Sequence, residues 1–192
     1  MPDDKPFKIL LVCPNIPRKL VLPGAIGIFT TILKKAGFEL DLFDATLYKT
    51  EASVSPEKRV DYLQARKFSY KENLGIELKP DLIGSFQEKV DSFKPDLLVF
   101  SVVEDAFLQA IALLDAVQEK NTPHIMGGVF TTAAPELALS YRQIKMIGIG
   151  EGEEVVLKLA ERLRDGLSFD DIPNTWVKKA DGTIIKNPPG PL

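Results

Sequence analysis

The sequence has little cysteine and histidine, and each shortage excludes a class of site. The single cysteine, Cys13, excludes an internal disulfide and any cysteine-ligated zinc or iron–sulfur site built from these 192 residues alone. The single histidine, His124, excludes a multi-histidine metal site in the same way. We therefore expect no metal site formed by this chain by itself.

Long apolar runs and a basic excess are also missing. No run approaches the roughly 20 apolar residues of a membrane span, and the charged start MPDDKPFK is not typical of a signal peptide. The net charge is −3 and no basic stripe is visible, so a nucleic-acid partner has little electrostatic support. These features predict a cytoplasmic α/β domain with a sizeable core, because apolar residues make up 45% of the chain.

Apolar runs alternate with amphipathic stretches along most of the chain. The predicted strands are 8–13, 38–43, 97–103, 123–126 and 145–149, and the predicted helices are 25–36, 81–93, 104–119, 131–140 and 153–163. This alternation predicts a doubly wound, flavodoxin-like (Rossmann-like) α/β fold with a five-stranded parallel sheet of order 2-1-3-4-5. Asp181-Gly182 between the β-prone runs 174–178 and 183–186 predicts a C-terminal β-hairpin. We divide the chain into an α/β domain, 1–170, and a hairpin with linker, 171–192.

Residues 45–79 show no clear period, although they carry many charges and several aromatic side chains. We expect a long excursion with one helix near 56–68. Such an excursion is usually functional or mobile. An interface with another domain and a mobile crossover both remain open.

The segment 144–155, IKMIGIGEGEEV, predicts the central strand–turn–helix junction. Its apolar start is typical of a buried strand, and its glycines permit positive φ or close backbone approach. Glu153 and Glu154 suit the first turn of a helix, where acids meet the positive end of the dipole. In parallel sheets ligands bind outside the carboxyl ends of the strands, so this loop and its neighbours are the candidate site.

Six segments, in this order, resemble a known family: KILLVCPNIP, AGFELDLFDA, KPDLLVFSVV, PHIMGGVFTTAAPE, MIGIGEGEEVVLKLAERL and DIPNTW. They are similar to the N-terminal cobalamin-binding domain of cobalamin-dependent radical S-adenosylmethionine enzymes, from about residue 8 to residue 187. The resemblance implies that cobalamin lies over the strand ends with its nucleotide tail among the loops. It also implies a parent enzyme of methyltransferase or cyclase type, in which a radical barrel domain of the same chain holds a 4Fe–4S cluster and S-adenosylmethionine.

The resemblance also assigns roles to residues of the strand-end loops. Ser101 and Val103 would lie against the tail, Gly127 and Gly128 would leave room for the dimethylbenzimidazole, and the loop at Gly148 would surround it. The full set of implied cofactor-binding residues is Pro14, Asn15, Ser101, Val102, Val103, Glu104, Gly127, Gly128, Gly148, Gly150, Glu151 and Gly152. A planar tail needs walls without Cβ atoms, which glycines provide.

Two departures from related patterns matter. Other cobalamin domains carry a cobalt-ligating histidine in an Asp-x-His-x-x-Gly loop after the first strand, whereas residues 14–19 here contain none. We therefore expect cobalamin to bind without a histidine ligand, with an empty lower axial position, a water, Glu104 or a side chain of the first loop below cobalt. The Cys-x-x-x-Cys-x-x-Cys pattern of the radical enzymes is also absent, so this chain by itself cannot cleave S-adenosylmethionine.

Plainer interpretations stand beside these. Ser101 either touches the cofactor or caps the helix near Glu104; Thr131 or Thr132 caps the next helix; Cys13 is buried and His124 structural. The Gly127-Gly128 pair is otherwise only a turn. Alternative functions are a flavodoxin-like or receiver-like domain with a non-catalytic interaction role, or the same fold without a ligand. The first loop lacks both a receiver's acidic pair and a flavodoxin's phosphate cradle.

Overall fold

The computed structural model describes residues 5–16, 23–49, 60, 62, 66 and 68–190. Seven strands form one sheet in the order β2-β1-β3-β4-β5-β6-β7. Their bounds are β1 Lys8–Cys13, β2 Glu39–Asp44, β3 Leu97–Ser101, β4 His124–Gly127, β5 Met146–Gly148, β6 Thr175–Lys178 and β7 Ile184–Lys186. Strands β1 to β5 are parallel, which confirms the predicted order 2-1-3-4-5, and the antiparallel hairpin β6–β7 extends the same sheet.

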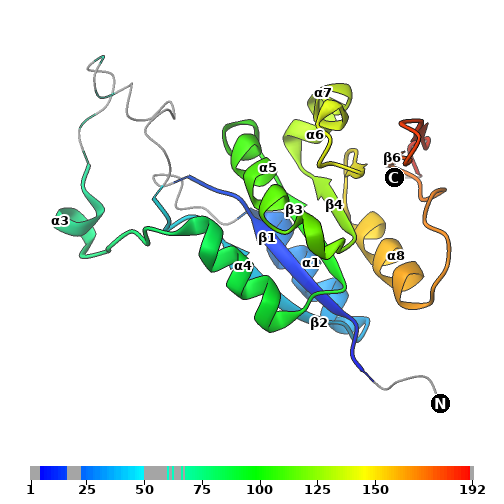
Figure 1. The fold of residues 1–192 in the computed structure, drawn as a ribbon, viewed down its shortest axis with the longest axis horizontal. Coiled ribbons are helices and arrows are strands. Elements are labelled where there is room, and N and C mark those ends of the chain that lie inside the picture. Colours follow the sequence, from blue (N-terminus) through cyan, green and yellow to red (C-terminus); the bar gives the residue numbers. More distant parts are fainter. Residues whose placement is uncertain are drawn as a thin grey trace.

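Helices cover both faces of the sheet (Figure 1). The α-helices are α1 Gly24–Lys35, α3 Tyr70–Leu74, α4 Leu82–Phe93, α5 Phe107–Ala116, α6 Val129–Ala133, α7 Pro135–Ser140 and α8 Glu153–Arg164. Two 3-10 turns, Glu104–Ala106 and Gln118–Lys120, flank α5. None of the helices in the described part of the chain is long and apolar enough to cross a membrane.

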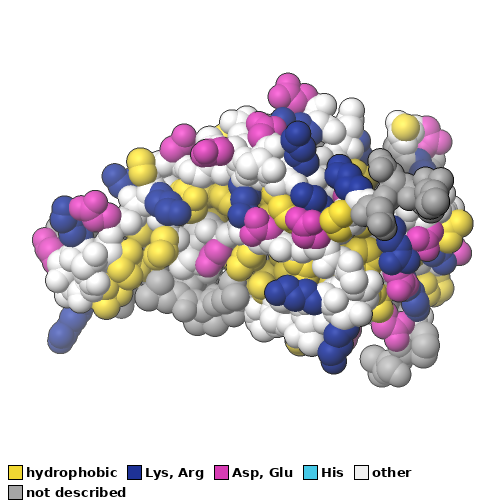
Figure 2. Space-filling view, turned by 90° about the horizontal axis from the view of Figure 1, so that it is seen from below, with side chains coloured by type: hydrophobic (Ala, Val, Ile, Leu, Met, Phe, Trp, Pro, Cys, Tyr) yellow, Lys and Arg dark blue, Asp and Glu magenta, His cyan; other side chains and the backbone are white. Residues whose placement is uncertain are grey.

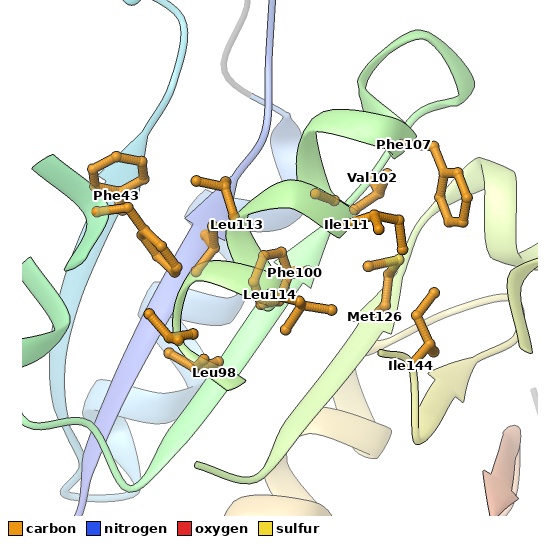
Figure 3. Close-up of a cluster of buried hydrophobic side chains, with 14 of the residues drawn as sticks. Phe43, Leu98, Phe100, Val102, Phe107, Ile111, Leu113, Leu114, Met126 and Ile144 are labelled. Atoms are coloured by element: carbon orange, nitrogen blue, oxygen red, sulfur yellow. The ribbon is translucent and has the colours of Figure 1, made fainter. Parts of the chain in front are cut away.

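The core has two layers, one on each side of the sheet. Alternate residues of a strand point to opposite faces, so Leu98 and Phe100 of β3 pack under α4 and α5, whereas Leu97 and Val99 pack under α1 and α8. Figure 3 shows the first layer, in which Phe100 and Leu114 meet between β3 and α5. Burial of both faces explains the continuous aliphatic runs of β1 and β3.

Three sequence predictions need correction here. The predicted helix 131–140 is two helices, because Pro135 begins α7 and cannot continue the hydrogen bonding of α6. The predicted strand 97–103 ends at Ser101, and the predicted helix 104–119 is α5 between its two 3-10 turns. The other predicted elements differ from the structure by only one or two residues at their ends.

The excursion after β2 begins and returns beside the sheet, where Tyr48 and Lys79 form an isolated parallel bridge. Within it, Ser69 accepts a hydrogen bond from the Glu72 amide and so caps α3, which the sequence did not predict. Figure 1 shows α3 apart from the sheet layers. The helix predicted near 56–68 falls mainly on residues outside the described ranges.

Charges of both signs are mixed on the surface drawn in Figure 2, without a basic stripe on that face.

Candidate functional site

Three small residues form a row across the carboxyl ends of β3, β4 and β5. Ser101 pairs with Gly127, and Met126 pairs with Ile147, so Gly148 is the next residue beside Gly127. By strand alternation these three residues point to the face covered by α1 and α8. We call Ser101, Gly127 and Gly148 the small-residue row.

A cavity of about 110 Å³, which we call the strand-end cavity, lies over this row. Its walls come from α1, from the strand residues one step below the row, and from α8. The apolar lining residues are Ala25, Phe29, Val99, Ile125, Val155 and Val156. Glu151 and Glu153 also line it, at the start of α8. The cavity exists because the row lacks side chains large enough to fill the space.

Gly127 and Gly148 have room for a side chain. A Cβ built on Gly127 would meet only the Phe100 carbonyl oxygen, at 3.9 Å, and one on Gly148 would approach nothing nearer than the Ile125 Cδ1, at 3.8 Å. The backbone therefore does not require glycine at these two positions on grounds of space. Their lack of side chains is what keeps the cavity open.

Gly128 and Gly152 are glycines for a different reason, close packing. Gly128 has a φ of 114°, and a Cβ there would lie 2.5 Å from the Val102 carbonyl oxygen. A Cβ on Gly152 would lie 2.9 Å from Cζ of Phe29, so this glycine lets α1 approach α8. Gly150, at a φ of 73°, needs its conformation rather than space.

Thr131 and Thr132 connect the loop after β4 to the loop after β5 by hydrogen bonds, which together we call the threonine fastening. The buried Thr131 hydroxyl lies 3.1 Å from the Gly128 carbonyl oxygen and 3.0 Å from that of Gly148. The Thr132 hydroxyl donates to the Gly128 carbonyl at 3.1 Å and accepts from the Gly150 amide at 3.0 Å. The predicted capping role for these threonines is wrong, because Gly128 is the N-cap of α6 and no side chain caps it. They hold the two glycine loops together instead.

Ser101 lines the strand-end cavity and does not cap the following helix. The N-cap of the 3-10 turn is Val103, and that turn has no side-chain cap. The alternative that Ser101 is a helix cap is therefore wrong. Its hydroxyl is the polar side-chain group of the small-residue row.

The structure brings seven of the predicted site residues together and separates the other five. Those that line the cavity are Ser101, Gly127, Gly128, Gly148, Gly150, Glu151 and Gly152. Pro14 and Asn15 follow β1 and are buried, and the Asn15 amide donates to the Thr46 hydroxyl at 2.9 Å beside β2. Val102 packs in the α5 layer, and Val103 and Glu104 are exposed where the 3-10 turn begins.

Neither Cys13 nor His124 lines the strand-end cavity, although Cys13 ends β1 on the same face of the sheet. The predicted burial of Cys13 is confirmed, and burial, and then the charge of Asp44, raise the pKa of its thiol to about 12, which disfavours the reactive thiolate. His124 begins β4, at the opposite end from Gly127, and its Nε2 accepts from the Lys145 amide at 3.3 Å. Among the described residues no group of three His, Cys, Asp or Glu side chains is placed to hold a metal ion.

A second hollow of about 680 Å³, the amino-end groove, lies at this opposite end of the sheet. Polar and apolar residues line it in similar measure, and part of the polar lining is already paired: Asp115 accepts from Arg142 at 3.0 Å and from the Gln143 amide at 2.8 Å. His124 and Lys145 form its sheet side.

Sequence reasoning did not find the helical walls of the strand-end cavity. Phe29 and Val156 appeared only as members of amphipathic patterns, which do not say which neighbours they meet. The signal that was present is Gly152, whose missing side chain is matched by the Phe29 ring.

The fold is that of a segment found in cobalamin-dependent radical S-adenosylmethionine enzymes, and this confirms the predicted resemblance. The chain is 25% identical over 188 residues to the tryptophan 2-C-methyltransferase of Streptomyces laurentii, an alignment that covers 96% of this chain and 28% of that enzyme. The chain thus spans less than a third of the length of this curated relative. No family model matches it.

Two solved enzymes show the same fold. The radical S-adenosylmethionine methyltransferase TsrM from Kitasatospora setae, solved with cobalamin and a [4Fe-4S] cluster, superposes with a TM-score of 0.72 at 20% identity, covering 98% of this chain and 30% of that one. The radical enzyme OxsB, solved with aqua-cobalamin and S-adenosylmethionine, gives a TM-score of 0.67 at 16% identity and covers 98% and 23%.

Proposed function

We propose that this chain is a cobalamin-binding domain and that it holds cobalamin over the carboxyl ends of β3 to β5 without a histidine ligand. The observation that carries the proposal is the small-residue row beneath an apolar cavity. The one histidine of the chain, His124, lies at the far end of β4. A ligand that approaches the strand ends therefore meets glycines, a serine hydroxyl and aliphatic walls.

The size of the cavity fits part of cobalamin and not the whole. Pockets that bury a complete drug-sized ligand usually measure roughly 300–1,000 Å³, whereas this one measures about 110 Å³. It suits a single flat ring system, the dimethylbenzimidazole of the tail, while the corrin lies above the strand ends. Filling Gly127 or Gly148 with a Cβ would narrow this space directly.

The remaining predicted contacts lie around the corrin rather than the tail. Val103 and Glu104 are exposed where the 3-10 turn begins, shortly after Ser101, and Val103 presents an apolar surface and Glu104 a carboxylate. Pro14, Asn15 and Val102 would shape the neighbouring loops from beneath. Cobalamin supplies the chemistry at its cobalt when bound, and this chain binds and orients it.

We further propose that the chain works as part of a larger cytoplasmic radical enzyme, of methyltransferase or cyclase type. A barrel domain in the same parent chain would hold the 4Fe–4S cluster and S-adenosylmethionine, because this sequence has one cysteine. Residues 171–192 would then be the hairpin and linker toward that barrel. The coverage of 23–30% of the compared enzymes supports this arrangement.

The flavodoxin-like and receiver-like alternatives find less support. The first turn of α8 already carries Glu153 and Glu154, which repel a phosphate from this helix start. The described residues also lack an acidic metal cluster of the kind that a receiver needs.

The test is a hydroxocobalamin titration of the purified chain, followed by gel filtration and a visible spectrum. We expect stoichiometric retention of colour and a base-off spectrum, because the tail leaves cobalt for the cavity. A base-on spectrum would overturn the tail placement, and retained flavin in place of cobalamin would overturn the function. If neither this chain nor its full-length parent retains cobalamin, the proposal is wrong.

A further inference from the structure

We propose that the strand-end cavity selects the lower base of the cobamide, accepting dimethylbenzimidazole and excluding a purine. Cobamides share the corrin and differ in this base, so the selection concerns which member of the class the chain binds. The inference rests on the proposed function, since it concerns the part of the cofactor that would enter the cavity. The inference depends on which polar atoms of the cavity wall already have hydrogen-bond partners within the chain.

Apart from Ser101 and the carboxylates of Glu151 and Glu153 at the start of α8, the side-chain walls of the cavity are apolar. Phe29 closes it from α1, Val99 and Ile125 from the sheet, and Val155 and Val156 from α8. All five are buried, with exposed fractions of at most 7%. A methylated benzene edge is stabilised by contact with such walls, whereas ring nitrogens and an amine are not.

Four main-chain groups of the glycine loops, three carbonyls and one amide, are occupied by the chain itself. The Gly127 carbonyl accepts from the Val102 amide at 2.8 Å. The carbonyls of Gly128 and Gly148 accept from the Thr131 hydroxyl, and the Gly150 amide donates to Thr132. The threonine fastening thus removes polar partners that a purine would otherwise use.

Ser101 supplies one hydroxyl at the floor of the cavity. Dimethylbenzimidazole, once detached from cobalt, has one free ring nitrogen, which matches this single hydroxyl. Adenine has several ring nitrogens and an exocyclic amine. Glu151 and Glu153 can accept only from the amine, so the ring nitrogens, which need donors, share the one hydroxyl of Ser101. Each unpaired polar group in such a place weakens binding, so we expect an adenine cobamide to bind at least tenfold more weakly.

The test compares three probes on the full chain: cobalamin, the adenine cobamide, and cobinamide, which lacks the nucleotide tail. Dissociation constants come from visible titration. We expect cobalamin to bind at least tenfold more tightly than either of the other two. Equal binding of cobalamin and the adenine cobamide would overturn the selectivity and leave the proposed function standing. Failure of all three to bind, both to this chain and to its full-length parent, would overturn both.

Two variants sharpen the test. Gly127→Ala puts a methyl group into the cavity and should weaken cobalamin about tenfold without changing cobinamide binding. The matched control is Gly27→Ala, on the exposed side of α1, where a Cβ meets nothing within 4 Å. If Gly127→Ala binds cobalamin as the wild type does, the tail does not use the cavity and the inference is wrong.

The second variant, Val99→Thr, adds a hydroxyl to the wall with little change of shape. It should narrow the preference for cobalamin over the adenine cobamide, by about threefold or more, because one purine atom gains a partner. Circular dichroism establishes that each variant is folded. An unchanged preference in a folded Val99→Thr protein would argue against selection by wall polarity.

Discussion

The two ends of the parallel sheet carry hollows that differ in size and in chemistry. The amino-end groove is about six times larger, yet part of its polar lining is already paired, as Asp115 is with Arg142 and Gln143. The strand-end cavity is small, but its floor lacks side chains on two neighbouring strands. The comparison teaches that paired polar lining and missing side chains separate the two hollows better than volume does.

We expect Gly128→Ala, at the carboxyl end of the sheet, to give the largest loss of stability. The residue occupies a conformation open almost only to glycine, and its Cβ would collide with the Val102 main chain. We expect the free energy of unfolding to fall by roughly 3 to 4 kcal/mol in urea titrations. Gly150→Ala is the control, since it has positive φ but free space, and should cost about 1 kcal/mol. Similar costs for the two variants would contradict the packing argument.

The contribution of the amino end of the sheet to stability can be tested by varying the pH. Burial is the main cause that lowers the pKa of His124 from 6.5 to about 4. As pH falls below 6.5 the unfolded chain binds a proton at His124 that the folded chain does not, so the contribution of His124 to stability declines between pH 6.5 and 4 and is constant below. The decline should reach roughly 3 kcal/mol in urea titrations across this range.

His124→Gln is the variant that isolates this contribution. It should remove the decline between pH 6.5 and 4 while leaving cobalamin binding unchanged, because the side chain lies at the other end of β4. A changed cobalamin spectrum in this variant would mean that the two ends of the sheet are coupled, which would contradict their independence.

The threonine fastening gives a smaller effect. Thr131→Val keeps the shape but removes the buried hydroxyl shared by the Gly128 and Gly148 carbonyls, and should cost about 1.5 kcal/mol. Thr132→Val, on the exposed side, should cost about 0.5 kcal/mol. Urea titrations compare the two. An equal loss of unfolding free energy in the two variants would mean that burial of the hydroxyl does not determine its contribution.

Ser101→Ala should have the smallest effect on stability, below about 0.5 kcal/mol, because the hydroxyl caps no helix. Cobalamin affinity should nevertheless fall several-fold in visible titrations, with cobinamide affinity unchanged. Loss of stability without loss of cobalamin affinity would give Ser101 a structural role only.

The sequence predicted the sheet well because buried parallel strands leave a strong pattern. KILLVC and LLVFS are apolar at every position except Lys8 and Ser101, and strand alternation then fixes which face Val99 and Ser101 share. The glycines at the ends of β4 and β5 also pointed to the strand ends that line the cavity. These are local signals, readable from neighbours in the chain.

The helical walls of the strand-end cavity and the threonine fastening could not be predicted from local sequence patterns. Phe29 meets Gly152 only because α1 and α8 pack against each other across more than a hundred residues of sequence. Thr131 and Thr132 look like helix caps locally, and only the proximity of the β5 loop gives their hydroxyls other partners. Pro135 is the one local signal that was underweighted, since it divides α6 from α7.

The buried thiol of Cys13 has a practical consequence for spectroscopy. Its side chain is 0% exposed and burial raises its pKa to about 12, so a maleimide dye added near neutral pH should not react with it. A cysteine introduced at an exposed position, such as Val129 at the mouth of the β4 loop, would then be the preferred attachment point. Fluorescence at that position could follow events at the carboxyl end of the sheet while the natural cysteine stays in place.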